Sequence, residues 1–179
     1  MKTVALVALS AALAATPQFP RAIDPARSHA SFSVQHIWVE RVTGVVPILS
    51  GSVTLAQGSK IPTSVQAVLD STSVHSGEPD RDRSLESPDF FDSQRYPQWT
   101  FGSTRIVPRG NDAFEMDGDL TIHGVTQLEH VNVTIGGTAS EPVYHGMATI
   151  DRHAFGMATT RLEPAIGARV DVTLDIVLK

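Results

Sequence analysis

The stretch that decides the fold is Phe114-Glu115-Met116-Asp117-Gly118-Asp119-Leu120-Thr121-Ile122. Apolar residues or glycine occupy every second position, and polar residues occupy most positions between them. Successive side chains of a β-strand point to opposite faces of the sheet. The alternation therefore predicts a half-buried strand with one apolar and one polar face.

The same alternation recurs on both sides of this stretch. The predicted strands span residues 30–35, 51–55, 65–70, 99–102, 114–122, 131–135, 144–150 and 168–178. The links carry turn residues, such as Gly136-Gly137, and are mostly too short for parallel crossovers. Eight antiparallel strands with one apolar face each predict an all-β fold, either a closed barrel or a sandwich. A barrel of this size is filled by side chains or holds one small ligand.

Strand parity also predicts which side chains face inward. Ten residues on the apolar faces are predicted to line a cavity or to pack its closed parts: Phe32, Val34, Trp99, Phe101, Phe114, Met116, Leu120, Val170, Val172 and Leu174. Six polar residues are predicted to face water: Ser31, Ser33, Thr54, Asp117, Asp171 and Asp175. A shift of one residue would exchange the two sets.

Two breaks interrupt the strands, at residues 37–44 and 71–97. The second contains a charged segment of helical character from Pro79 to Glu86. Ser87-Pro88 resembles an N-cap followed by proline at the first helical position, so a helical turn carrying Phe90 and Phe91 is predicted next. This helical insertion, around residues 79–95, is either a lid on an apolar cavity or a plug that fills one end of a barrel.

Composition limits the location and the partners of the protein. Lys2, a short apolar stretch and Ala12-Leu13-Ala14 predict a cleaved signal peptide over residues 1–15, followed by one domain over residues 20–179. The 179 residues include no cysteine, which excludes disulfides and thiolate metal ligands. The net charge is −5 without a basic run, which argues against nucleic acid and anionic membranes as partners. We expect a periplasmic or secreted protein without stable membrane insertion.

Four motifs carry a resemblance to a known family. Ile23-Asp24-Pro25-Ala26 comes first, and Ser87-Pro88-Asp89-Phe90-Phe91-Asp92 is the most specific. Gly118-Asp119-Leu120-Thr121-Ile122-His123-Gly124 and Ile150-Asp151-Arg152-x-x-Phe155-Gly156 follow. In this order the sequence resembles the YceI-like family of bacterial, mostly periplasmic proteins. The resemblance implies an eight-stranded antiparallel lipocalin-like barrel whose interior holds a polyisoprenoid or another lipid-like chain.

The resemblance and the strand parity together give a candidate binding site. His36 continues the parity of Phe32 and Val34, and Arg81 and Asp82 precede the predicted lid. These three polar residues are the candidates for contact with a ligand head group. The candidates for contact with the ligand chain are Phe32, Val34, Phe90, Phe91, Trp99, Phe101, Phe114, Met116 and Phe155. Ser84, where the family commonly has histidine, and His153-Ala154 depart from the family pattern near the predicted head-group site.

The sequence favours a carrier over an enzyme. It contains no Gly-x-Ser-x-Gly elbow, phosphate loop, dinucleotide fingerprint or His-Glu-x-x-His motif, so we expect no cofactor and no metal. The leading hypothesis is a carrier of a long apolar molecule, a polyisoprenoid lipid or an isoprenoid quinone. The alternatives are a small barrel enzyme acting on such a lipid and a ligand-free, stress-related barrel protein. The oligomeric state, including a homodimer, stays open.

Overall fold

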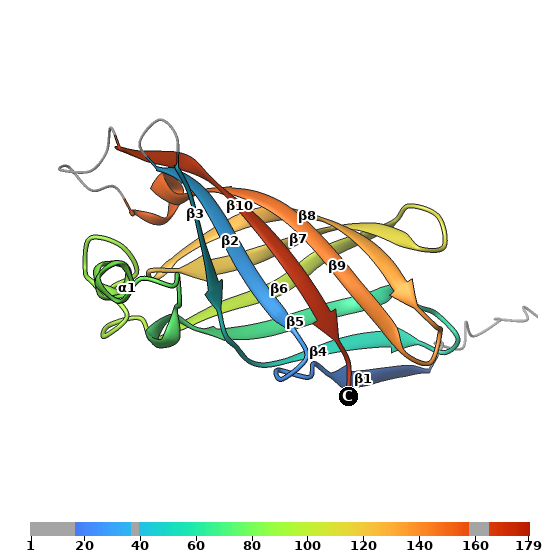
Figure 1. The fold of residues 1–179 in the computed structure, drawn as a ribbon. Helices are drawn as coiled ribbons and strands as arrows, with labels where there is room; N and C mark the ends of the chain where they lie inside the picture. The colour runs from blue at the N-terminus through green and yellow to red at the C-terminus, as the bar shows by residue number, and fades with distance from the viewer. Residues whose placement is uncertain (1–16, 37–39, 158–164) are drawn as a thin grey trace, which may run out of the picture.

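A single antiparallel sheet forms most of the molecule (Figure 1). The computed structural model describes residues 17–36, 40–157 and 165–179. The strands are β1 (Gln18–Ala22), β2 (His29–His36), β3 (Glu40–Val46), β4 (Ile48–Ala56), β5 (Pro62–Asp70), β6 (Gln98–Pro108), β7 (Ala113–Ile122), β8 (Val125–Gly137), β9 (Pro142–Asp151) and β10 (Ile166–Val177). One α-helix, α1 (Pro79–Glu86), and two short 3₁₀ helices, η2 (Ser71–Ser73) and η3 (Arg152–Phe155), complete the described fold.

The sheet curls until its two ends meet. Its strand order is β1-β4-β5-β6-β7-β8-β9-β10-β2-β3, so β3 stands at one end and β4 stands next to the other. Only Pro47 separates β3 from β4. The chain therefore passes directly from one end of the sheet to the other, and the strands enclose an interior (Figure 1).

The all-β antiparallel fold is confirmed, but the predicted number of strands was too low. The structure has ten strands, and β1 and β3 are the two that were missed. β1 has no period-two pattern and contains Pro20, which is tolerated because β1 pairs only with β4, at the edge of the sheet. β3 begins inside the predicted break at residues 37–44 and ends two residues beyond it, and Gly44 occupies one inward position and obscures the alternation with Val42 and Val46. Residues 37–39 lie outside the described part of the chain.

The predicted strand register is correct. The alternating apolar residues of β2, β6 and β7 face the interior, including Phe32, Phe101 and Met116. Their polar neighbours form contacts on the outside, where Arg41 donates a hydrogen bond of 2.9 Å to Asp171 and Arg105 donates one of 2.7 Å to Asp117. Ser31 keeps the predicted register, because its hydroxyl forms an exposed hydrogen bond of 3.3 Å to the Thr173 carbonyl.

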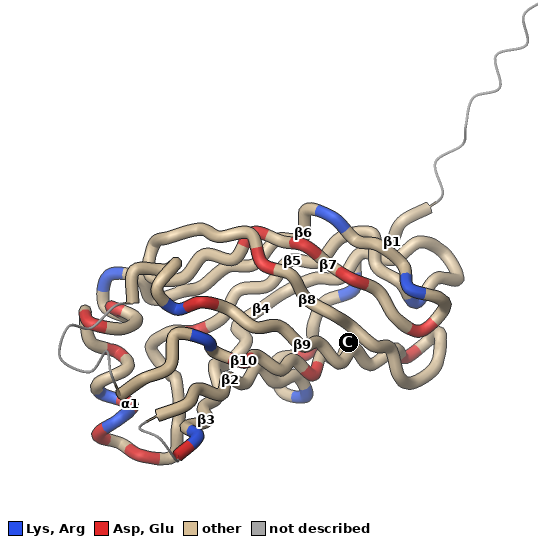
Figure 2. The backbone as a smooth tube through the Cα atoms, turned by 90° about the horizontal axis from the view of Figure 1, so that it is seen from above, with Lys and Arg blue, Asp and Glu red and all other residues tan. Residues whose placement is uncertain are grey.

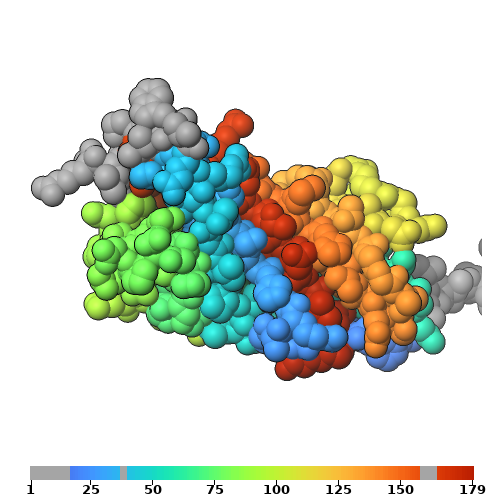
Figure 3. Space-filling model, in the orientation of Figure 1, coloured from blue at the N-terminus to red at the C-terminus, as the bar shows by residue number. Residues whose placement is uncertain are grey.

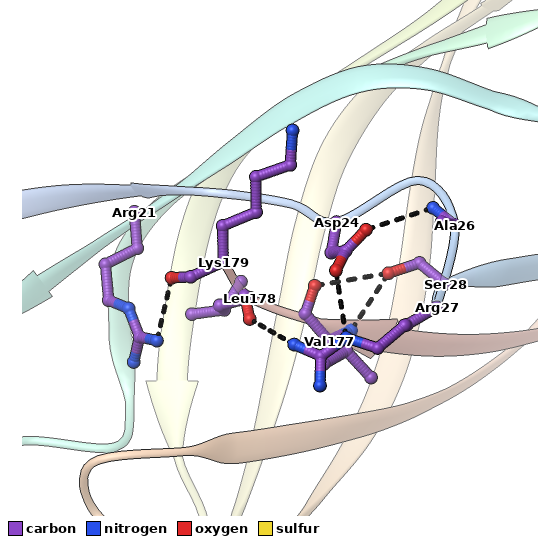
Figure 4. A network of polar contacts seen from close by, with 8 residues as sticks. All are labelled: Arg21, Asp24, Ala26, Arg27, Ser28, Val177, Leu178 and Lys179. Carbon is purple, nitrogen blue, oxygen red and sulfur yellow. Dashed lines mark hydrogen bonds and ion pairs between the residues drawn. The ribbon is translucent and has the colours of Figure 1, made fainter.

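The Ile23–Ser28 segment joins the start of the sheet to the end of β10 (Figure 4). Ile23 forms a bridge with Leu178, and the Asp24 amide donates a 2.8 Å hydrogen bond to the Val177 carbonyl. The buried Ser28 hydroxyl donates to the same carbonyl at 3.2 Å and accepts from the Val177 amide at 3.0 Å. These contacts close the gap between β1 and β10.

The insertion at residues 71–97 covers one end of the sheet, and the atoms of α1 and its flanking turns form that end in the space-filling view (Figure 3). Hydrogen bonds join the two ends of the insertion to each other. The Ser71 hydroxyl donates to the Tyr96 carbonyl at 2.6 Å, and the Ser93 hydroxyl donates to the Ser71 carbonyl at 2.7 Å. His75 forms a two-hydrogen-bond bridge with Val45, so the insertion also covers part of the edge of β3.

The helical segment from Pro79 to Glu86 is confirmed, but the helix predicted after Ser87 is wrong. Ser87 is the C-cap of α1, and both its amide and its hydroxyl donate to the Ser84 carbonyl. The residues that follow form turns, in which the Phe90 and Asp92 amides donate to the Ser87 carbonyl. The insertion is therefore helical over residues 79–86 rather than throughout 79–95. Charged residues are dense along α1 (Figure 2).

The closure at Val177 gives a stability prediction. Ser28→Ala removes both contacts of the hydroxyl and leaves the Val177 amide without an acceptor, so we expect the free energy of unfolding to fall by about 1–3 kcal/mol. The measurement is urea denaturation. Ser31→Ala is the matched control, because Ser31 forms one long, exposed hydrogen bond to the Thr173 carbonyl, at 3.3 Å. Equal losses in the two variants would contradict the closing role of Ser28.

Candidate functional site

The interior of the curled sheet is a cavity of about 510 Å³. Two clusters of buried apolar residues close its ends. The cluster beneath the 71–97 insertion includes Phe91, Trp99 and Ile150, and the cluster at the opposite end includes Phe114 and Tyr144. Between them the wall is almost entirely aliphatic or aromatic. The volume of the cavity lies within the range of small-molecule binding sites.

Most of the predicted site residues line this cavity. Ten of the twelve lie on its wall: His36, Arg81, Phe32, Val34, Phe90, Phe91, Trp99, Phe101, Phe114 and Met116. Phe90 and Phe91, the adjacent phenylalanines of the predicted helical turn, are both buried and both border the cavity. The turns after Ser87 and the left-handed Asp92 (φ 46°) make this arrangement different from a single helical turn.

Two predicted residues lie away from the cavity wall. Phe155 is 0% exposed and packs within the cluster beneath the insertion. The Asp82 carboxylate instead accepts hydrogen bonds from the Ser76 amide at 2.7 Å and the Ser76 hydroxyl at 2.5 Å, and it lies 3.1 Å from His75 Nδ1. Hydrogen bonding from Ser76 lowers the pKa of Asp82. Asp82 therefore fastens α1 to the segment that bridges β3.

Two glycines keep phenylalanine rings against the wall. A Cβ atom at Gly44 would lie 2.4 Å from Cζ of Phe32, and a Cβ atom at Gly118 would lie 2.2 Å from Cζ of Phe101. Such distances are too short for any side chain, so each ring lies directly over the backbone of its glycine. This placement preserves space along the cavity.

Five polar residues of the wall come from the β2–β3 hairpin and from α1. His36 and Glu40 are cross-strand partners at the tip of the β2–β3 hairpin, and Asp80, Arg81 and Ser84 come from α1. These five residues define the mouth of the cavity. Neither the His36 side chain nor the Arg81 side chain forms a hydrogen bond or an ion pair with another described residue. Their polar groups are available to a ligand.

Glu129 is a wall residue that the sequence analysis missed. It continues the inward parity of Val131 and Val133 on β8, and it lies opposite Gly118 on β7. The sequence signal that could have identified Glu129 is a single acidic residue at an inward position of an otherwise apolar strand face. Burial, together with the nearby carboxylate of Asp151, raises the pKa of Glu129.

Arg152 was quoted as part of a motif but was not proposed as a site residue. It is buried at the start of η3 and borders the cavity. Its guanidinium donates to the carbonyls of Gly167 and Ile166, both at 3.0 Å, and to the Met157 carbonyl. These bonds fasten η3 to the start of β10.

The far end of the cavity is held by Tyr144. Its hydroxyl donates a 3.0 Å hydrogen bond to the Lys60 carbonyl, and its ring packs edge-on against Phe114. Burial raises the pKa of Tyr144 to about 12. The phenol therefore stays neutral and the hydrogen bond persists over the ordinary pH range.

Residues 17–36, 40–157 and 165–179 contain no cluster of three or more His, Asp or Glu side chains placed to hold a metal ion. In the same part of the chain, none of the helices has the length and apolar character needed to cross a membrane.

Comparison with known proteins identifies the family. The profile of the YceI-like domain matches residues 22–178, which is nearly all of the described chain. The chain belongs to the YceI-like family. A UPF0312 protein of Vibrio parahaemolyticus is 34% identical to this YceI-like chain over 145 residues, covering 80% of this chain and 74% of the relative.

Solved structures share the fold of this chain. BcnA of Burkholderia cenocepacia superposes with a TM-score of 0.80 at 26% identity, covering 88% of this chain and 99% of BcnA. A domain of Saccharophagus degradans, described as polyisoprenoid-binding and implicated in plant cell wall breakdown, has a TM-score of 0.67 at 15% identity. That likeness covers 92% of this YceI-like chain and 99% of the domain.

Glu129 gives a prediction for the pH dependence of stability. A carboxyl group with a raised pKa in the folded state favours folding below its unfolded-state pKa, and this contribution disappears as pH rises through the folded-state pKa. Glu129→Gln should therefore stabilise the protein at neutral pH relative to the wild type, and this gain should diminish toward acidic pH. The measurement is urea denaturation across pH.

Glu115→Gln is the matched control on the adjacent strand. The hydrogen bond from Arg109 lowers the pKa of Glu115, so its contribution is present at neutral pH and disappears as pH falls through the folded-state pKa. The two variants should thus show opposite signs at neutral pH. A pH-independent effect of Glu129→Gln would contradict the assignment of Glu129 to the apolar wall.

Proposed function

We propose that this YceI-like protein is an exported carrier that holds a long-chain apolar molecule, a polyisoprenoid lipid or an isoprenoid quinone, inside the sheet. The observation that carries the proposal is the apolar cavity of about 510 Å³, whose polar residues gather mainly at one mouth. The description of the Saccharophagus domain as polyisoprenoid-binding supports the same class of ligand. The residues near the N-terminus that predict export lie outside the described part of the chain.

The apolar wall can supply enough binding free energy without a specific head group. Removing a methylene-sized group from water contributes about 0.8 kcal/mol. Ten such groups contribute roughly 8 kcal/mol before the cost of ordering the chain, which is the scale of micromolar affinity. His36 and Arg81 at the mouth would then determine orientation more than affinity.

The arrangement of titratable groups supports binding rather than catalysis. Acid–base catalysis requires paired groups within hydrogen-bond reach of a substrate. The described His–Asp pairs all lie away from the cavity wall; they are His75–Asp82, His130–Asp117, His145–Asp175 and His153–Asp151. Ser84, a hydroxyl on the cavity wall, donates its hydrogen bond to the Asp80 carbonyl.

The carrier function is tested by loading the cavity. Protein exported to the periplasm of a bacterial host and purified without detergent should carry an apolar molecule that is visible by native mass spectrometry and extractable into organic solvent. Delipidated protein should bind an added polyprenyl alcohol or quinone with micromolar or tighter affinity. Only unliganded protein, together with no binding of either added lipid, would contradict the carrier function.

Neighbouring residues of β9 provide a matched pair of variants for this test. Ala148 borders the cavity, whereas Met147 points outward and is 63% exposed. Ala148→Phe should fill part of the cavity and reduce lipid occupancy. Met147→Phe adds comparable bulk outside and should leave occupancy unchanged.

The distinction between lid and plug gives a separate prediction. Phe91 packs edge-on against Trp99 with ring centroids 4.7 Å apart. If the insertion is a lid, Phe91→Ala should accelerate ligand release while lowering the free energy of unfolding by less than about 3 kcal/mol, because truncation of a well-packed core phenylalanine costs about 3–5 kcal/mol. Stopped-flow release and urea denaturation measure the two effects.

Phe114→Ala, in the cluster at the opposite end, is the control and should show the full core penalty. A comparably large stability loss in Phe91→Ala with an unchanged release rate would identify the insertion as a plug.

A further inference from the structure

Trp99 presents a buried polar atom that has no partner. The residue lies near the start of β6, is 6% exposed and borders the cavity. Its indole Nε1 is buried without a hydrogen-bond acceptor among the described residues. Buried N–H groups in native proteins nearly always have an acceptor, so this atom requires an explanation.

The protein surroundings of Trp99 provide apolar surface rather than acceptors. Phe91 covers the indole edge-on, and Leu69 on β5 and Ile122 on β7 belong to the same apolar cluster. A tryptophan whose buried N–H group never had an acceptor would lower the stability of the protein relative to phenylalanine at this position. Because Trp99 borders the cavity, a ligand held there can bring an acceptor to this atom.

We propose that the ligand buries its oxygen-bearing end inside the cavity, beneath Phe91, where a neutral oxygen accepts a hydrogen bond from Trp99 Nε1. This inference rests on the proposed carrier function and specifies its ligand class. The ligand is a long apolar chain that ends in a carbonyl, ether or hydroxyl oxygen. An unfunctionalised hydrocarbon cannot satisfy the indole.

The charges around the cavity favour a neutral oxygen over a phosphate. Burial of an anion requires a cation or several donors. The Arg152 guanidinium already donates to the Gly167, Met157 and Ile166 carbonyls, and Arg81 lies at the mouth on α1. Glu129 adds a carboxyl group to the wall, which would repel an anion whenever it is ionised.

The test compares three probes with the same chain: geranylgeraniol, the corresponding hydrocarbon and geranylgeranyl phosphate. The wild type should bind the alcohol about three- to tenfold more tightly than the hydrocarbon, the gain from one hydrogen bond, and the phosphate should gain nothing over the alcohol. Trp99→Phe, which keeps an aromatic ring but removes the N–H, should abolish the preference for the alcohol while hydrocarbon binding persists. Thr100→Ala, at the exposed next position of β6, is the control and should keep the preference.

A second measurement does not depend on the folding of a variant. The indole N–H resonance of Trp99 in ¹⁵N-labelled wild type should shift when geranylgeraniol binds and shift much less when the hydrocarbon binds. Two results would overturn the proposal. One is an alcohol preference that survives in Trp99→Phe, and the other is a preference that disappears in Arg81→Ala but not in Trp99→Phe. Equal binding of alcohol and hydrocarbon by the wild type would reject this subsite alone, whereas no binding of any probe would reject the carrier function as well.

Discussion

The structure depends on one constraint, which is that a single curled sheet must enclose its own apolar face. The passage through Pro47 from β3 to β4 brings the ends of the sheet together, and the contacts of Asp24 and Ser28 with Val177 close the gap beside β10. A sheet closed in this way has no second layer to cover its apolar face. The inward side chains must therefore fill the interior themselves or leave a cavity.

The inward residues leave a cavity because the largest rings lie along the wall and the buried clusters gather at the ends. The rings of Phe32 and Phe101 lie over Gly44 and Gly118, and Phe91 belongs to a cluster beneath the insertion. In an apolar space of low dielectric constant, each polar group has a large effect, because leaving it without a hydrogen-bond partner is costly. The specificity of the cavity therefore depends on a few atoms, whereas its affinity depends on the whole wall.

Period-two alternation was sufficient to predict the fold class and the inward face, since the parity of Phe114, Met116 and Leu120 permits only one register. It failed where the pattern was interrupted: Pro20 in β1 and Gly44 in β3 hid two strands. The local signal at Ser87-Pro88 was overridden because α1 ends at this serine. Asp82 could not be placed from the sequence, because its role depends on contacts with His75 and Ser76 that form only in the folded insertion. Whether the wall residues bind a ligand remains a prediction.

The central claim is that a long apolar chain occupies the interior of the sheet. Isotope-filtered NOE spectroscopy of methyl-labelled protein with unlabelled geranylgeraniol tests it most directly. The account predicts contacts from the chain to the inward methyl groups of Ala148, Val172 and Leu174, and none to those of Leu128 and Met147, which are exposed on the outer face. Contacts confined to Leu128, Met147 or other outward methyl groups would contradict it.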